Sequence, residues 1–337
     1  MWRRVRRALR VPAPVVLVLL LAPVTAEYLI GYDDITGNVA ALLFGIVFFA
    51  PLYGAPAVLI REVTRRRGLG WPSILLLAAG FGLIEAGLVD QSLFDPAYRD
   101  IDYWDDLRDP TFLPFLGTSA YMILSFVGGH VLGSIAAPIA MAESWWPERA
   151  RRPWLGRRGL VVTALLWAAG SAFILVDQLR STSFRISPGE LWGTVAVVLA
   201  LVGVALTRSC ARPPAAGGVP RPWVVGLVTA VLLTVRNAVP TGWVGTTAAV
   251  LAIGIWLALL ATWSARSGWD GRHLVAALAG DLLSIGGPAF LTTPLGDVPL
   301  ATKLASNVAL LALVLALAAR GYRCEQRWSV AQASLRP

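Results

Sequence analysis

Long apolar runs, separated by short charged or Pro/Gly-rich segments, dominate the pattern of hydrophobic and polar positions along this chain. Runs such as residues 15–22 do not alternate between apolar and polar positions, which argues for helices and against transmembrane β-strands. A helix needs about 20 apolar residues to cross a bilayer, where its backbone groups must bond to one another. The sequence therefore predicts ten membrane-spanning helices, the seventh being the shortest, at about residues 11–31, 38–60, 72–94, 112–142, 159–176, 191–207, 222–235, 241–263, 273–292 and 302–319.

The composition agrees with a protein that has little mass outside a bilayer. Of the 337 residues, 56% are hydrophobic and 15% charged, and the mean hydropathy is +0.65. In soluble domains roughly a quarter of all residues are charged, which is well above the fraction in this chain. A Rossmann enzyme, a solenoid, a disulfide scaffold and a disordered chain are therefore excluded. We expect an all-α polytopic bundle forming one domain over 1–337, with a motif-bearing half at 1–160 and a second half at 161–337 that ends in a short cytoplasmic tail.

The basic residues alternate between successive loops. With the N-terminus inside, 23 of the 29 Lys and Arg residues fall on inner segments and six on outer ones. This asymmetry predicts that both termini are cytoplasmic. We expect the chain in the cytoplasmic membrane of a bacterium, because its 28 Arg against one Lys suit a high-GC genome. We expect the Arg-rich inner loops to contact anionic lipid headgroups and not nucleic acid. The first run also resembles a signal peptide, but its apolar character continues through residues 28–30, which favours an uncleaved helix.

The loop from Asp95 to Asp109 is acidic and aromatic, unlike the other loops. Two interpretations stay open: a solvated acidic loop, and a lid or vestibule that attracts cations. A calcium loop of the EF-hand type is excluded, because that loop needs a fixed spacing with a central glycine. We expect this segment on the outer face, where it holds Asp95, Asp100, Asp102, Asp105, Asp106 and Asp109 with Tyr98, Tyr103 and Trp104 interleaved.

A few ionisable side chains interrupt the apolar runs, and each costs several kcal/mol inside a bilayer unless it serves a purpose. Glu143 falls at a helix end, where we expect it to reach water at little cost. The others predict a polar pocket open to the outer face. Glu85 and His130 would form the floor of this pocket, and Glu27, Asp90 and Asp281 its walls. Ser134 lies one helical turn beyond His130. The candidate site residues are therefore Glu85, His130, Glu27, Asp90, Ser134 and Asp281.

Glu85 and His130 lie on the third and fourth predicted helices, which one loop joins and which we expect to be neighbours. A buried carboxylate beside an imidazole is a stable pair, because each group stabilises the charged form of the other. The pair could relay protons, act as an acid and base, or hold a metal. It could equally be a structural hydrogen bond worth about 1 kcal/mol between helices.

No cofactor is evident, because the chain lacks GxxxxGK[ST], GxSxG and HExxH motifs. A divalent metal would need His130 and Glu85 with a further carboxylate, since the second histidine, His273, begins the ninth predicted helix beside an inner loop. One short internal echo relates Ser134-Ile-Ala-Ala-Pro138 to Ser284-Ile-Gly-Gly-Pro288. The two segments lie five helices apart, and a repeat unit of five helices would place its second copy in the inverted orientation. The similarity is therefore either chance or a trace of an inverted repeat of the kind that transporters use.

Several short motifs look familiar as a set. They are Glu27-Tyr28-Leu29, Pro51-Leu52-Tyr53-Gly54, Leu59-Ile60-Arg61-Glu62, Gly70-Trp71-Pro72-Ser73, Gly82-Leu83-Ile84-Glu85-Ala86-Gly87-Leu88, Gln91-Ser92-Leu93-Phe94-Asp95-Pro96, His130 to Glu143, and Pro153-Trp154-Leu155-Gly156. Over residues 27–160 the chain resembles a group of uncharacterised multi-pass bacterial membrane proteins of an actinobacterial type. The resemblance implies a location and a topology but no activity.

A looser likeness is to the CPBP (CAAX protease and bacteriocin-processing) intramembrane proteases. Those carry a Glu-Glu-x-x-x-Arg motif, a Phe-x-x-x-His motif and a later histidine motif. Phe126-Val-Gly-Gly-His130 fits the second motif, whereas Glu85-Ala86 fills only half of the first and Gln91 stands near the position of the arginine. No later histidine fits the third motif. The likeness to these proteases implies metal-dependent hydrolysis, but only the second of their three motifs is complete in this chain.

Three classes of function therefore stay open. The first is a transporter or binding protein for a small solute or protons, which uses the buried Glu/His pocket. The second is an intramembrane metal-dependent hydrolase, and the third is a scaffold of a membrane complex. They differ in what Glu85→Gln should change: uptake or binding for the first, cleavage for the second, and nothing for the third.

Overall fold

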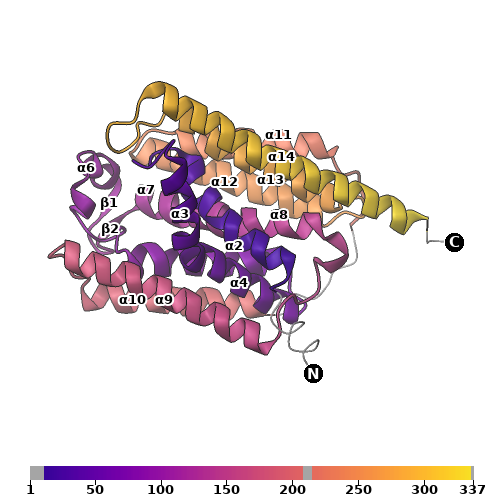
Figure 1. Ribbon diagram of the computed structural model, residues 1–337, viewed down its shortest axis with the longest axis horizontal. Coiled ribbons are helices and arrows are strands. Elements are labelled where there is room, and N and C mark those ends of the chain that lie inside the picture. The colour runs from indigo at the N-terminus through magenta and orange to yellow at the C-terminus, as the bar shows by residue number, and fades with distance from the viewer. Residues whose placement is uncertain (1–10, 208–214, 335–337) are drawn as a thin grey trace.

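The computed structural model describes residues 11–207 and 215–334, and nearly all of its regular structure is helical (Figure 1). Twelve of the α-helices that it describes form the bundle, and four π-helical turns extend or join them. The α-helices are α2 (Ala13–Ala26), α3 (Val39–Phe49), α4 (Ala55–Arg66), α5 (Trp71–Ile84), α7 (Ala120–Met122), α8 (Ala137–Trp145), α9 (Arg157–Ser181), α10 (Pro188–Leu206), α11 (Pro222–Ala238), α12 (Trp243–Ser264), α13 (Gly271–Gly286) and α14 (Leu300–Ala333). The π-helical turns are η2 (Ala50–Gly54), η3 (Glu85–Val89), η6 (Ile123–Val127) and η7 (His130–Ala136).

Nine helices within the described residues are long and apolar enough to cross a membrane. This is the architecture expected of a multi-pass membrane protein. The seventh predicted run forms α11, which has only 17 residues and is the shorter apolar helix of the set. The bundle therefore contains a helix for every predicted run.

Two predicted helix boundaries differ from the structure more than the others, each for a local reason. Residues 112–119 do not begin the fourth helix but form a two-stranded hairpin, β1 (Phe112–Leu113) and β2 (Thr118–Ser119), whose turn places Gly117 at φ +70°. The helix then begins where the Ser119 hydroxyl accepts a hydrogen bond from the Met122 amide. At the other end of the chain, α14 continues to Ala333, well past the predicted end at 319, because residues 320–333 are polar but mostly good helix formers.

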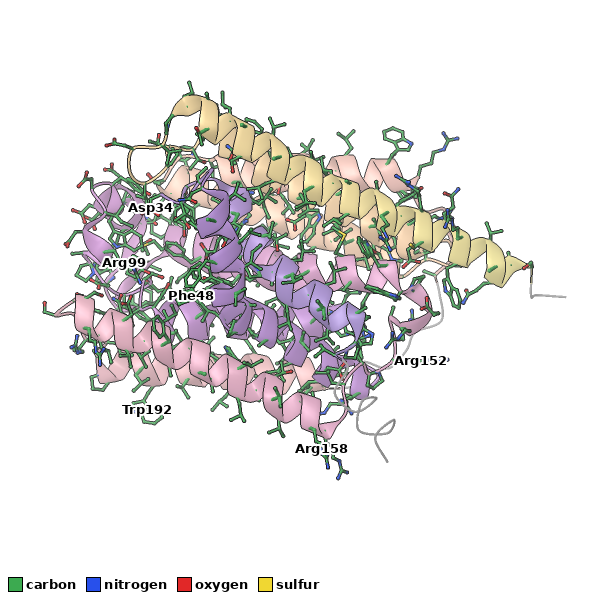
Figure 2. All side chains as sticks on the ribbon, viewed as in Figure 1. Asp34, Phe48, Arg99, Arg152, Arg158 and Trp192 are labelled. Carbon is green, nitrogen blue, oxygen red and sulfur yellow. The ribbon has the colours of Figure 1, made fainter. Side chains whose placement is uncertain are left out.

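The bundle has two distinct ends (Figure 1). The hairpin and the short helix α6 (Trp104–Arg108) lie at one end, which we call the loop end. The N-terminus of α2 and the C-terminus of α14 lie toward the opposite end of the bundle, which we call the arginine end. Figure 2 shows Asp34 and Arg99 at the loop end, with Arg152 and Arg158 projecting near the arginine end.

The helices differ strongly in how much of them faces the interior. In α2 and the turn η1 (Tyr28–Ile30), 61% of the apolar window is buried, so this element is central. In α9 the share is 6%, and α9 presents large apolar side chains outward, as does α10 with Trp192 (Figure 2). An apolar outer surface is stable against lipid and unstable against water.

The second half packs around the pair α11 and α13. These helices approach closely at Gly226 and Gly280, where any side chain on Gly280 would collide with the Gly226 carbonyl. The internal echo has no counterpart in local structure. Residues 134–138 run through a continuous helix, whereas residues 284–288 span the end of α13 and the start of the 3₁₀ turn η9 (Pro288–Phe290).

Candidate functional site

The structure brings the side chains of Glu85 and His130 into contact. His130 Nε2 lies 2.8 Å from Glu85 Oε2, and the two side chains are 14% and 3% exposed. Gly82 permits this contact, because a Cβ at that position would lie 3.1 Å from Val127 Cα and 3.2 Å from His130 Cβ. The absence of a side chain at Gly82 thus lets the two helices approach closely enough for the pair to form.

A serine completes the surroundings of the imidazole. Ser134 Oγ lies 3.0 Å from His130 Nδ1, one helical turn along the same face. A hydroxyl can donate to a neutral ring nitrogen or accept from a protonated one. The ring can therefore carry one proton or two without losing either of its hydrogen-bond partners.

Glu27 joins this pair through tyrosines that the sequence analysis did not select. Tyr53 donates a hydrogen bond to Glu27 Oε1, and Tyr32 donates to Glu27 Oε2 at 2.7 Å. The Tyr53 ring stacks on the His130 ring, with centroids 5.8 Å apart and planes inclined by 27°. Glu27 is therefore linked to Glu85 through one phenol and one imidazole, by hydrogen bonds at the two ends and by ring stacking between them. The sequence could have indicated these tyrosines, because a tyrosine within an apolar helix needs a hydrogen-bond partner for its hydroxyl.

Three of these side chains stand on π-helical turns. Tyr53 belongs to η2, Glu85 begins η3 and His130 begins η7. Single π turns inside α-helices are rare and occur often at functional sites, because the extra residue redirects the side chains around it. The unusual backbone thus coincides with the polar residues.

Asp90 lies just beyond Glu85, beneath the loop 90–119. Its carboxylate accepts a hydrogen bond from the Ser92 amide at 2.9 Å and a long one from the Tyr98 hydroxyl at 3.4 Å. We call Glu27, Tyr53, Glu85, Asp90 and His130 the outer cluster. The rings of Tyr98 and Trp104 lie 5.0 Å apart with their planes inclined by 32°, so the loop brings a pair of aromatic rings against Asp90.

The loop itself is only partly a solvated acidic segment. Five of its six aspartates from 95 to 109 are exposed, in line with that interpretation. Asp95, however, is 1% exposed, and its Oδ2 accepts a hydrogen bond from Gln178 on α9 at 3.1 Å. Trp104 is also buried and donates to the Asp95 carbonyl. The segment is therefore a folded cap that is anchored to the bundle.

The outer cluster carries more acidic groups than basic ones. It holds three carboxyl groups and one imidazole, and within the described residues no Lys or Arg nitrogen lies within 4.0 Å of Glu27, Glu85 or Asp90. Carboxylates that share a poorly solvated site repel one another. The repulsion is relieved when a carboxyl group takes up a proton or when a cation lies among them. The arrangement is thus suited to binding protons or cations.

Asp281 does not belong to the outer cluster, and its predicted place in the pocket wall is wrong. It is buried on α13, and its Oδ1 has no hydrogen-bond partner in the described part of the chain. His273 is also remote: it lies at the start of α13, where its Nδ1 is 2.9 Å from Asp270 Oδ1 and its ring stacks on Trp269. His273 therefore contributes to a helix cap.

A second buried charge cluster lies at the arginine end. Arg61 and Glu62 have fully buried side chains whose Nη1 and Oε1 atoms are 2.8 Å apart. Arg61 Nε also lies 3.0 Å from Glu143 Oε1, and Arg65 Nη2 lies 2.6 Å from Glu143 Oε2. The Arg61 guanidinium stands 3.5 Å over the Trp154 ring. We call these residues the arginine network, in which every carboxylate faces a guanidinium.

The prediction that Glu143 reaches water at a helix end is therefore wrong. Its side chain is 4% exposed, because the segment after α8 folds back over it. Arg61 Nη2 donates to the carbonyls of Arg149 and Ala150 in that segment, and the Trp154 amide donates to Glu62. Two of the arginines assigned to lipid headgroups, Arg61 and Arg65, thus join α4 to α8, and Arg61 also holds the segment that follows α8.

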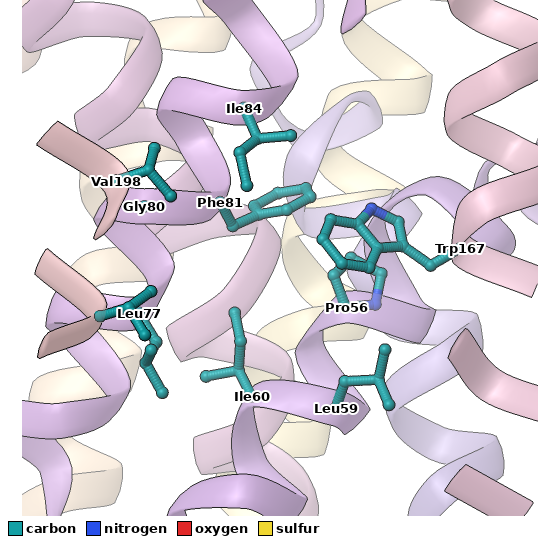
Figure 3. A pocket seen from close by; sticks show the side chains of 10 residues that line it. Pro56, Leu59, Ile60, Leu77, Gly80, Phe81, Ile84, Trp167 and Val198 are labelled. Atoms are coloured by element: carbon teal, nitrogen blue, oxygen red, sulfur yellow. The ribbon is translucent and has the colours of Figure 1, made fainter. Parts of the chain in front are cut away.

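An apolar cavity of about 130 Å³ lies beside the outer cluster (Figure 3). Phe81 separates the two, since its ring packs edge-on against His130 at 5.6 Å. The cavity has no ionisable lining and offers no acid–base chemistry. It is lined by Pro56, Leu59, Ile60, Leu77, Gly80, Phe81, Ile84, Trp167, Val198 and Val202.

Within residues 11–207 and 215–334 no three His, Cys, Asp or Glu side chains are grouped so that they could hold a metal ion. The pair Glu85 and His130 supplies two ligands, whereas structural and catalytic zinc sites use three or four protein ligands. Comparison with known proteins adds no further guide, because no family model, curated protein or solved structure matches the chain.

Proposed function

We propose that this chain is a multi-pass protein of a bacterial cytoplasmic membrane that binds or transports protons, or a small solute coupled to protons, through the outer cluster. The observation that carries the proposal is the 2.8 Å contact of His130 with Glu85 among carboxyl groups that lack a basic partner. A proton taken up there removes negative charge where repulsion is strongest. Histidine titrates near physiological pH, which suits repeated uptake and release.

In this proposal the chain crosses the membrane ten times, with both termini in the cytoplasm and the loop end outside. With α11 as a crossing, 23 of the 29 basic residues stay on one side. The 17 residues of α11 span about 25 Å, somewhat less than the roughly 30 Å of hydrocarbon, a mismatch that bilayers accommodate. Exposed arginines such as Arg152 and Arg158 would then meet anionic lipid headgroups.

Infrared difference spectroscopy tests proton uptake directly. We would step the pH of the purified full-length protein in uncharged detergent from about 8 to about 5, the range in which histidine changes its charge. We expect a difference spectrum of proton uptake that Glu85→Gln alters, because it removes the negative partner of His130, and that the matched control Asp106→Asn, at an exposed aspartate, leaves unchanged. Identical spectra for wild type and a folded Glu85→Gln variant would overturn the proposal.

A metal-dependent hydrolase is the second candidate, favoured by one observation: the histidine of Phe126-x-x-x-His130 contacts Glu85. The test is the metal content of purified wild type and His130→Ala. About one zinc or similar ion per chain in wild type, lost in the variant, would support the hydrolase. Absence of metal from both proteins would retire it and leave the proton-binding function in place.

A further inference from the structure

Arg236, near the loop end of α11, is a buried cation with no carboxylate against it. It is 9% exposed, and in the described part of the chain no Asp or Glu oxygen lies within 4.0 Å of its guanidinium. Its hydrogen bonds go to neutral oxygens: Asn237 Oδ1 at 2.8 Å, the Leu124 carbonyl at 3.1 Å and the Ser125 carbonyl at 3.0 Å. These bonds occupy three of the five N–H donors of a guanidinium, which stays charged in proteins.

A cavity of about 200 Å³ lies against Arg236, between α2, η6, η7, α11 and η9. Its polar lining includes Asn237, Tyr121, Ser125 and Thr292, and the rest is mainly apolar. Pockets for whole drug-sized ligands are usually about 300–1,000 Å³. This cavity therefore fits one polar group, with room for little else.

Two adjacent glycines create the space. A Cβ at Gly128 would lie 2.7 Å from Arg236 Nη2, so only glycine lets the guanidinium rest on the helix backbone. Gly129 lines the cavity and has open space where its side chain would be. The helix that carries His130 on one side thus leaves a vacant space on the side of Arg236.

Asp281 does not neutralise Arg236 by contact. It lies outside the cavity lining, and no nitrogen of Arg236 comes within 4.0 Å of its carboxylate. Its Oδ1 has no hydrogen-bond partner among the described residues. A buried charge is costly unless a counter-charge and hydrogen bonds compensate it. Here Asp281 supplies a counter-charge only from beyond salt-bridge distance, and the hydrogen bonds go to neutral oxygens.

We propose that this cavity binds an oxyanion, the phosphate or carboxylate group of a ligand, with Arg236 as the counter-charge. Guanidinium suits both groups because its donors match their oxygens in pairs. The group could belong to a lipid or to a water-soluble molecule, since the recognition chemistry is the same. None of Glu27, Glu85 and His130 lines the cavity, so this site stands independently of the function proposed above.

The test is ligand-dependent thermal unfolding of the full-length protein in uncharged detergent. The probes are inorganic phosphate, acetate and dioctanoyl phosphatidic acid, with dioctanoylglycerol as the matched lipid that lacks the phosphate. In wild type we expect at least one anionic probe to raise Tm by on the order of 5 °C at saturating concentration. The exposed control Arg185→Gln should keep this shift, and Arg236→Gln should lose it.

Gly129→Leu provides a second variant that leaves Arg236 in place. Leucine would fill the cavity and is a better helix former than glycine, so we expect a folded protein without the anion-dependent shift. A shift with inorganic phosphate or acetate identifies a water-soluble ligand, and a shift with phosphatidic acid alone identifies a lipid. The proposal is overturned if no anionic probe shifts wild type, or if Arg236→Gln and Gly129→Leu shift as wild type does.

Discussion

At the arginine end, Glu62 and Glu143 face the guanidinium groups of Arg61 and Arg65, and each carboxylate has a cation within 3.0 Å. At the loop end, the three carboxyl groups of the outer cluster share one imidazole. Both regions bury ionisable groups among apolar helices. Only the first of them balances its charges within the protein.

This difference supports a structural role for the first region and, for the second, the proton binding proposed above. A balanced network gains nothing from a proton or an ion, because any added charge disturbs good pairs. An acidic cluster with one titratable base is stabilised by each proton or cation that it takes up. The comparison therefore predicts that changes at the arginine end alter stability and that changes at the loop end alter proton binding.

The largest expected effect is on the balanced region. Arg61→Met should destabilise the protein by about 3–5 kcal/mol, because it leaves Glu62 and Glu143 buried with fewer partners. Thermal unfolding in detergent measures this, with the exposed Arg152→Met as the control. Equal melting temperatures for the two variants would show that burial and pairing of Arg61 do not matter.

A smaller effect should follow from separating the reactive pair without changing any charge. Gly82→Ala introduces a Cβ that crowds Val127 and His130 and pushes them slightly apart, so we expect a loss of about 1–3 kcal/mol and a change in the infrared difference spectrum. Gly203→Ala is the matched control, because open space surrounds Gly203 on α10. A Gly82→Ala protein with the wild-type difference spectrum would contradict the link between close packing and proton binding.

The smallest effect should come from a paired charge that is not deeply buried. Asp270 caps α13 and lies 2.7 Å from Arg272, with a side chain that is 30% exposed. Burial alone would raise the pKa of Asp270, but hydrogen bonds from Arg272 and His273 outweigh burial and lower it. Asp270→Ala should cost about 0.5–2 kcal/mol, the usual worth of an N-cap.

The pH dependence of this third change has a definite sign. A carboxyl group whose pKa is lower in the folded state contributes its full stability above the unfolded pKa of about 3.9 and loses it as the pH falls through the folded pKa. Melting temperatures of wild type and Asp270→Ala should therefore differ at neutral pH and converge below about pH 4. A difference that persists in acid would assign the effect to packing and not to charge.

Much of the fold follows from hydropathy and loop length. Apolar runs define the helices, and the single loop between the third and fourth helices brings Glu85 next to His130. The partners of Glu27 could not be derived in this way. Tyr53 reaches it from a helix whose π turn redirects the side chain, and one-dimensional patterns do not reveal π turns.

The errors share a physical origin. Glu143 was assigned to water because it ends a helix, yet the following segment folds over it. Asp281 was assigned to the outer cluster because it lies in mid-helix, but depth along one helix does not fix the direction in which a side chain points. Tertiary contacts decide each of these cases.

The serine next to the imidazole has a consequence for how the site would respond to acid. Because the Ser134 hydroxyl can turn its hydrogen toward His130 or away from it, the ring can change its charge while all heavy atoms stay where they are. The reorganisation that accompanies charging would then be the rotation of a single O–H bond. In the proton-binding function proposed above, so small a rearrangement would keep the barrier to proton exchange low.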